Sequence, residues 1–91
     1  MKKETALMRL KGAYVKTGKK HRAAYRMLCT AIEDGRSLQP AFWHRGKNNL
    51  FDLRDYTFGC LSLLREAHIL FVYVETPYKC RNYIVFTHIF N

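Results

Sequence analysis

The chain closes with REAHILFVYVETPYKCRNYIVFTHIFN, residues 65–91, a stretch that holds two nearly continuous apolar runs. The first run, residues 69–74, is rich in β-branched and aromatic side chains on both faces, which is typical of a central strand covered on both sides. Residues 76–79, Thr-Pro-Tyr-Lys, supply turn chemistry before the second run. The stretch therefore predicts a β-hairpin with strands at residues 68–75 and 83–90.

Alternation ahead of this hairpin predicts a third strand. Over residues 50–56, Phe51 and Leu53 fall on one side and Arg54 falls on the other, as in a half-buried strand. Residues 58–67 fit either a loop with a short helix or an additional strand. We therefore expect the C-terminal half to form an antiparallel sheet of three or four strands.

The N-terminal half has helical periodicity instead. Apolar residues recur at helical spacing over residues 4–15 and again over residues 19–33, and the segments end at Lys16-Thr17-Gly18 and at Gly35. This pattern predicts a helical hairpin over residues 1–35 that packs on one face of the sheet over residues 50–91, an α+β fold in a single domain. The expected apolar stripes are Leu7, Leu10 and Tyr14 in the first helix, and His21, Tyr25, Leu28 and Ile32 in the second.

Composition narrows the class of protein. No apolar run approaches the roughly 20 residues that cross a bilayer, and the opening Met-Lys-Lys-Glu does not begin a signal peptide, so we expect a cytoplasmic protein with no membrane partner. Cys29, Cys60 and Cys80 are odd in number and lack C-x-x-C spacing. The sequence therefore indicates no disulfide framework, no metal site and no cofactor.

Positive charge is concentrated in the first half of the chain. Residues 1–47 hold twelve Lys and Arg against three acids, whereas residues 48–91 hold four of each, so the first half carries the whole net charge of +9. A polyanion such as RNA, DNA or the ribosome is the natural partner of such a surface, although a basic surface that only confers solubility is the alternative. The residues expected to contact nucleic acid are Lys19, Arg22 and Arg26 of the second helix, and Arg45 and Lys47 of a predicted loop at residues 39–49.

Four segments between residues 19 and 91 carry a resemblance to a known family. They are KKHRAAYRMLCTAIEDGRSLQP, NNLFDLRD, REAHILFVYVE and YIVFTHIFN. They resemble a long second helix, a strand ending in Leu-Arg, a polar turn followed by an apolar strand, and the last strand of the RelE/YoeB/HigB family. Members of this family are small bacterial and phage toxins that cleave mRNA and are neutralised by an antitoxin. The resemblance implies a RelE-like fold, RNA or the ribosome as target, and an antitoxin protein as partner.

The resemblance also implies a set of catalytic residues. Metal-independent RNA cleavage needs an acid, a base and cationic donors for the charge that builds on the phosphate. Arg54 and Arg65 would clamp the phosphate, because a guanidinium presents a bidentate fork to its oxygens. His88 would act as acid or base, and Tyr73 would act as a base or stack on an RNA base.

Each of these residues also has a structural interpretation. Arg54 and Arg65 could form ordinary pairs with neighbouring acids, and His88 and Tyr73 could fill the core. Two further functions stay open on the sequence alone. One is a non-catalytic phage or bacterial protein that regulates or inhibits by binding nucleic acid or nucleoprotein through its basic residues, and the other is a protein whose exposed sheet edge pairs with another chain.

Overall fold

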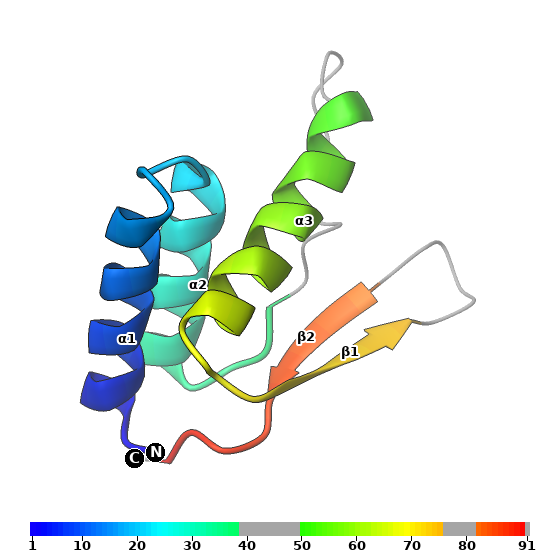
Figure 1. The fold of residues 1–91 in the computed structure, drawn as a ribbon. Coiled ribbons are helices and arrows are strands. Elements are labelled where there is room, and N and C mark those ends of the chain that lie inside the picture. The colour runs from blue at the N-terminus through cyan, green and yellow to red at the C-terminus, as the bar shows by residue number, and fades with distance from the viewer. Residues whose placement is uncertain (39–49, 76–81, 91) are drawn as a thin grey trace.

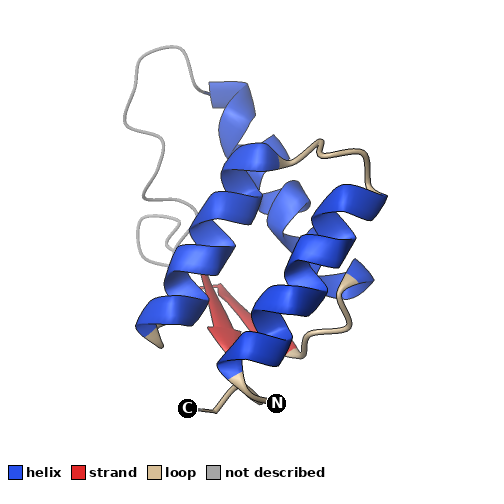
Figure 2. Cartoon of the chain, turned by 90° about the vertical axis from the view of Figure 1, so that its left-hand side faces the viewer, coloured by secondary structure: helices blue, strands red, loops and turns tan. Residues whose placement is uncertain are grey.

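The computed structural model describes residues 1–38, 50–75 and 82–90, and within these the side chains of residues 50–56, 75 and 82 are not described. The fold is α+β, with the three helices grouped beside a two-stranded antiparallel sheet (Figures 1 and 2). No helix in the described ranges combines the length and the apolarity needed to cross a membrane. In chain order the elements are α1 (Lys3–Lys16), α2 (Arg22–Asp34), α3 (Leu50–Glu66), β1 (Phe71–Glu75) and β2 (Asn82–Phe86).

The predicted helical hairpin is confirmed. α1 and α2 run side by side in opposite directions and are joined by a short turn (Figure 1). α1 has nearly the expected bounds, whereas α2 begins at Arg22 and not near residue 19, so Lys19 lies in the turn. Gly35, the expected C-cap, has the left-handed conformation with φ of 69°.

All three helices end in the same way. After α1, Gly18 is left-handed and the Lys19 N–H donates to the carbonyl of Tyr14 over 2.9 Å. After α3, His68 is left-handed and the Ile69 N–H donates to the carbonyl of Leu64 over 3.0 Å. After α2, Gly35 is left-handed and the Arg36 N–H donates to the carbonyl of Ala31 over 3.0 Å. These are Schellman motifs, in which carbonyls that the helix leaves unpaired accept a bond from the departing chain.

The predicted strand at residues 50–56 is wrong. These residues form the first half of α3, which continues through residues 58–67, the segment that was open between a short helix and a strand. The alternation of apolar and polar residues around Arg54 spans too few residues to distinguish the period of a strand, two residues, from that of a helix, 3.6 residues. In the second half of α3 and directly after it, the buried residues Cys60, Leu63, Leu64 and Ala67 have helical spacing.

The predicted hairpin of strands is confirmed, but the sheet is smaller than expected. β1 and β2 pair antiparallel from Phe71 opposite Phe86 to Glu75 opposite Asn82. Both strands are shorter than predicted, and the described residues form two strands and not three or four. β2 also pairs with Leu38 through an isolated antiparallel bridge. In it, Leu38 and Ile84 exchange backbone hydrogen bonds of 2.9 and 2.7 Å.

The expectation that residues 69–74 are covered on both sides is also wrong. The side chains alternate: Phe71 and Tyr73 are half-buried, whereas Leu70, Val72 and Val74 are exposed at 59, 48 and 38%. The sheet therefore packs one face against the helices, and its other face is apolar but open.

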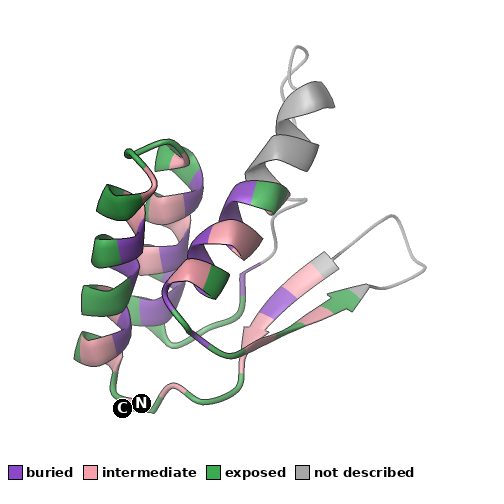
Figure 3. Cartoon of the chain, in the orientation of Figure 1, coloured by how far each residue is buried: buried purple, intermediate pink, exposed green. Residues whose placement is uncertain are grey.

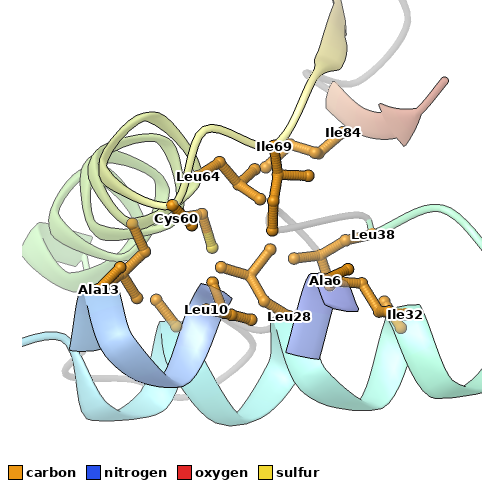
Figure 4. Close-up of a cluster of buried hydrophobic side chains, with 14 residues drawn as sticks. Ala6, Leu10, Ala13, Leu28, Ile32, Leu38, Cys60, Leu64, Ile69 and Ile84 are labelled. Carbon is orange, nitrogen blue, oxygen red and sulfur yellow. The ribbon is translucent and has the colours of Figure 1, made fainter. Parts of the chain in front are cut away.

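The core lies between the three helices and the inner face of the sheet (Figures 3 and 4). Leucines from α2 and α3, with Leu38 and Ile84, form its centre. Alanines occupy many of the positions between α1 and α2. The buried stripe of α1 therefore differs from the predicted one, because Ala13 is buried and Tyr14 is only half-buried. The buried residues of these two helices are Ala6, Leu10 and Ala13 in α1, and Ala24, Leu28, Ala31 and Ile32 in α2.

Contact between α3 and the α1–α2 turn depends on a glycine. A Cβ atom at Gly59 would lie 2.8 Å from Nδ1 of His21 and 2.9 Å from its Cβ, closer than such atoms approach in proteins. The His21 ring also meets Phe58 edge to face, with ring centroids 6.0 Å apart. Gly59 thus lets the start of α2 pack directly on α3.

We expect Gly59→Ala to lower the free energy of unfolding by about 1–3 kcal/mol, because the new methyl group overpacks against His21. The matched control is Gly12→Ala in α1, where an added Cβ meets nothing within 4 Å. That substitution should raise the free energy of unfolding by about 1 kcal/mol, the usual gain in a helix interior. Urea unfolding followed by circular dichroism measures both, and a gain in both variants would contradict the proposed contact.

Candidate nucleic-acid interface

Cations gather where α1 turns into α2. Lys16, Lys19, Lys20, Arg22 and Arg26 lie within eleven residues of sequence, and all five are exposed. The antiparallel packing of the two helices brings the end of α1 and the start of α2 to the same end of the hairpin (Figure 1). Five of the ten Lys and Arg residues in residues 1–38 therefore lie at one end of the hairpin.

Two tyrosines lie beside these cations. The rings of Tyr14, from α1, and Tyr25, from α2, are stacked with centroids 4.1 Å apart and planes 3° from parallel. Both side chains are half-buried. Together with Lys19, Arg22 and Arg26 they line an open groove of about 510 Å³. We call these five residues the tyrosine groove.

The turn holds one cation of the groove in a strained conformation. Lys19 has φ of 59°, in the left-handed region that residues with a Cβ adopt at a cost. Gly18, which precedes it, is also left-handed with φ of 79°, so the chain reverses within two residues. The Schellman bond from Lys19 to Tyr14 therefore ties a groove cation directly to the backbone of a groove tyrosine.

Four other cations of the described region are already engaged. The Lys16 ammonium pairs with Glu66 over 2.8 Å, and the hydrogen bond in this pair raises the pKa of Lys16 and lowers the pKa of Glu66. Arg36 pairs with Asp34 over 3.2 Å. Lys3 and Arg9 donate to backbone carbonyls, at 3.0 and 3.4 Å.

The cations of the tyrosine groove have no such partners. Among the residues that the structure describes, Lys19, Arg22 and Arg26 make no side-chain hydrogen bond and no ion pair. The first turn of α2 also has no acidic residue, and the N-cap side chain of His21 does not bond to the helix. The positive end of the α2 dipole thus adds to their charge.

Burial and a neighbouring thiol affect the titration of Tyr25. Burial first, and then the neighbouring Cys29, raise the pKa of the Tyr25 phenol, with a hydrogen bond between the two side chains contributing. Burial likewise raises the pKa of Cys29. Both groups therefore stay neutral around pH 7, and the thiol is a poor nucleophile.

The residues predicted to act in catalysis are spread over the fold. Arg54 and Arg65 both lie on α3, eleven residues apart, which corresponds to about 16 Å along the helix axis. Tyr73 lies on the inner, half-buried face of β1. His88 follows the end of β2 and is exposed, so neither the strand position nor the core position expected for it is correct.

Contacts of the neighbouring residues separate Arg65 from His88. Glu66, adjacent to Arg65, pairs with Lys16 in the last turn of α1. The carbonyl of His88 instead accepts a 2.8 Å bond from the amino group of Met1, ahead of the first turn of α1. α1 has 14 residues and is about 21 Å long, so these two residues lie towards its opposite ends. Nδ1 of the His88 ring lies 2.8 Å from Oγ1 of Thr87, within hydrogen-bond distance.

The predicted nucleic-acid-binding residues divide into two sets. The structure brings Lys19, Arg22 and Arg26 together in the tyrosine groove, whereas Arg45 and Lys47 lie outside the described residues. The helical spacing of the two tyrosines predicted positions in the apolar stripes and not on this surface. A signal was present, since Tyr25 lies three residues after Arg22 and next to Arg26.

Metal-binding clusters and known relatives give no further assignment. The described ranges contain no group of three or more His, Cys, Asp or Glu side chains arranged to hold a metal ion. Comparison of the chain with protein-family models, with curated proteins and with solved structures gave no match. The functional interpretation therefore depends on the groove itself.

We expect Lys19→Gly to raise the free energy of unfolding by about 1 kcal/mol, because glycine adopts a positive φ without the steric cost that a Cβ imposes. Lys19→Gln is the matched control, since it removes the same charge and keeps the Cβ. Chemical denaturation distinguishes them, and equal stabilities of the two variants would show that Lys19 is not strained.

The raised pKa values of Tyr25 and Cys29 predict a pH dependence of stability. The folded protein holds these protons more tightly than the unfolded chain, so the contribution is complete below the ordinary values of 9.0 for Cys29 and 10.0 for Tyr25 and is lost as pH rises past them. Denaturation midpoints should therefore fall from about pH 8 to about pH 11. The fall should be smaller in the Tyr25→Phe/Cys29→Ser double variant, and an unchanged slope would refute the assignment.

Proposed function

We propose that the chain is a nucleic-acid-binding protein that acts through the basic end of the α1–α2 hairpin. The observation that supports this most directly is the state of the groove cations: Lys19, Arg22 and Arg26 are exposed, close together and without partners among the described residues. Cations held in this way are available to replace the counterions of a phosphate backbone. A surface that served only solubility would not need them beside paired aromatic rings.

Binding without cleavage is the function that the geometry supports best. Acid–base groups and phosphate clamps must act on one scissile phosphate, within hydrogen-bond reach of it. The Glu66 contact next to Arg65 and the His88 contact lie at opposite ends of α1, and the groove that holds the other cations is lined by two tyrosines with, among the described residues, no carboxylate and no histidine. The mRNA-cleaving activity that the RelE-type resemblance implies, and the antitoxin partner, stay predictions.

The chemistry and placement of the groove cations also indicate what kind of binding to expect. The cations are long, charged side chains on a helix surface and a turn, which suit contacts to phosphates, and such contacts position a protein without reading sequence. The affinity is therefore set by electrostatics, depends steeply on salt concentration and varies little with sequence.

The test is the double charge reversal Arg22→Glu/Arg26→Glu. It should weaken binding of a labelled RNA or DNA strand by at least about tenfold at low salt and reduce the slope of log affinity against log salt by about two, one for each lost phosphate contact. Fluorescence anisotropy over a salt series measures both quantities. Lys19→Gly and Lys19→Gln should each lose about one unit of slope, whatever their difference in stability.

The matched control is Lys2→Glu/Lys11→Glu, which changes the net charge by the same amount at two exposed positions outside the groove. This control should bind nearly as well as the wild type. An equal loss in both double variants would show that only total charge matters and would contradict a local interface. RNA recovered from the binding reactions should be intact on a denaturing gel, and cut RNA would restore the nuclease prediction.

A further inference from the structure

We infer that the nucleic acid bound at the tyrosine groove is single-stranded, and that one unpaired base packs against the stacked pair of Tyr14 and Tyr25 while its phosphates meet Arg22, Arg26 and Lys19. This inference rests on the proposed function and specifies its ligand. It follows from the presence of aromatic surface and free cations in one groove, a combination that a duplex does not use.

The aromatic part of the groove is rigid. Tyr14 and Tyr25 come from different helices, yet their planes are only 3° from parallel, because the packing of α1 on α2 holds both rings. A preformed aromatic surface requires little ordering when a base packs on it, so more of the stacking energy is available for binding.

The cations are at the right separation from the rings for a single nucleotide. Arg22, Tyr25 and Arg26 stand at positions i, i+3 and i+4 of α2, so they share one face of the helix with about 5–6 Å between neighbouring Cβ atoms. A base and its own phosphate are linked through one sugar and span a similar distance. One nucleotide can therefore contact Tyr25 through its base and an arginine through its phosphate.

A duplex would leave the tyrosines unused. Its bases are paired and stacked on one another, and reaching a base face requires the nucleotide to be flipped out at a cost of a few kcal/mol. Single strands present these faces without that cost, and aromatic stacking contributes about 1–3 kcal/mol for each base. Since every base has such a face, the inferred contact is tolerant of sequence and occurs with both RNA and DNA strands.

The experiment varies the ligand first, so that the protein stays unchanged. The full chain is titrated into labelled oligothymidine and oligouridine strands of about twelve nucleotides, a duplex of that length, and an oligothymidine strand in which abasic sites replace the central bases. Both intact strands should bind about tenfold more tightly than the abasic strand, which keeps every phosphate. The duplex should bind no more tightly than the abasic strand.

The protein side of the test is Tyr25→Leu, with Tyr25→Phe as its matched control. Tyr25→Leu should lower the affinity for the intact strands about tenfold and leave the affinity for the abasic strand unchanged. This is the result expected of a double-mutant cycle when the ring and the base contact each other, because removing either one already removes the contact. Tyr25→Phe keeps the ring face and should bind like the wild type. If Tyr25→Leu fails to fold, the abasic comparison with wild-type protein alone decides.

The outcomes separate this inference from the proposed function. Equal affinity for intact strand, abasic strand and duplex would overturn base stacking, while a loss in Arg22→Glu/Arg26→Glu would leave the electrostatic interface in place. A strand affinity that responds neither to salt nor to the charge reversals would overturn both. Equal loss on the intact and abasic strands in Tyr25→Leu would show that the ring acts only through the fold.

Discussion

Close packing of α1 on α2 is the constraint on which the candidate site depends. Four of the seven buried residues of these helices are alanines, and the large ones are Leu10, Leu28 and Ile32 (Figure 4). Because the distance between packed helices follows the size of the side chains at the contact, small residues bring the two backbones near each other. Larger residues at the edge of the contact, Tyr14 and Tyr25, are then brought face to face and stack outside the core. The groove is thus a consequence of how the core is filled.

Features with a local cause could be predicted from the sequence, and features with a distant cause could not. The ends of α1 and α2 follow from Gly18 and Gly35, which take the left-handed conformation that a helix end requires. The end of α3 was missed because His68 takes that conformation in place of a glycine. The apolar alternation after it was correct for a strand, but which face is covered depends on helices far away in the sequence, and Val72 and Val74 proved to be exposed.

The candidate site was predictable to the same extent. Exposed cations on a helix opposite an apolar stripe need no tertiary information, so Arg22 and Arg26 were placed correctly. The tyrosines were not, because a stripe read from spacing gives a large apolar residue priority over an alanine, whereas the structure buries Ala13 and Ala24 and leaves Tyr14 and Tyr25 at the rim. In the predicted catalytic set, Arg54 was placed on a strand at residues 50–56, and that segment is helical.

The strained turn connects stability with the proposed function. A glycine at position 19 would complete the end of α1 at lower cost, as Gly18 and Gly35 do at similar positions. The chain instead carries a lysine there, with its N–H bonded to Tyr14 and its side chain lining the groove. A residue in an unfavourable backbone conformation persists where its surroundings hold it, and such residues cluster at functional sites. The left-handed Lys19 is therefore independent support for a function at this end of the hairpin, because neither the core nor the helix end requires a cation at that position.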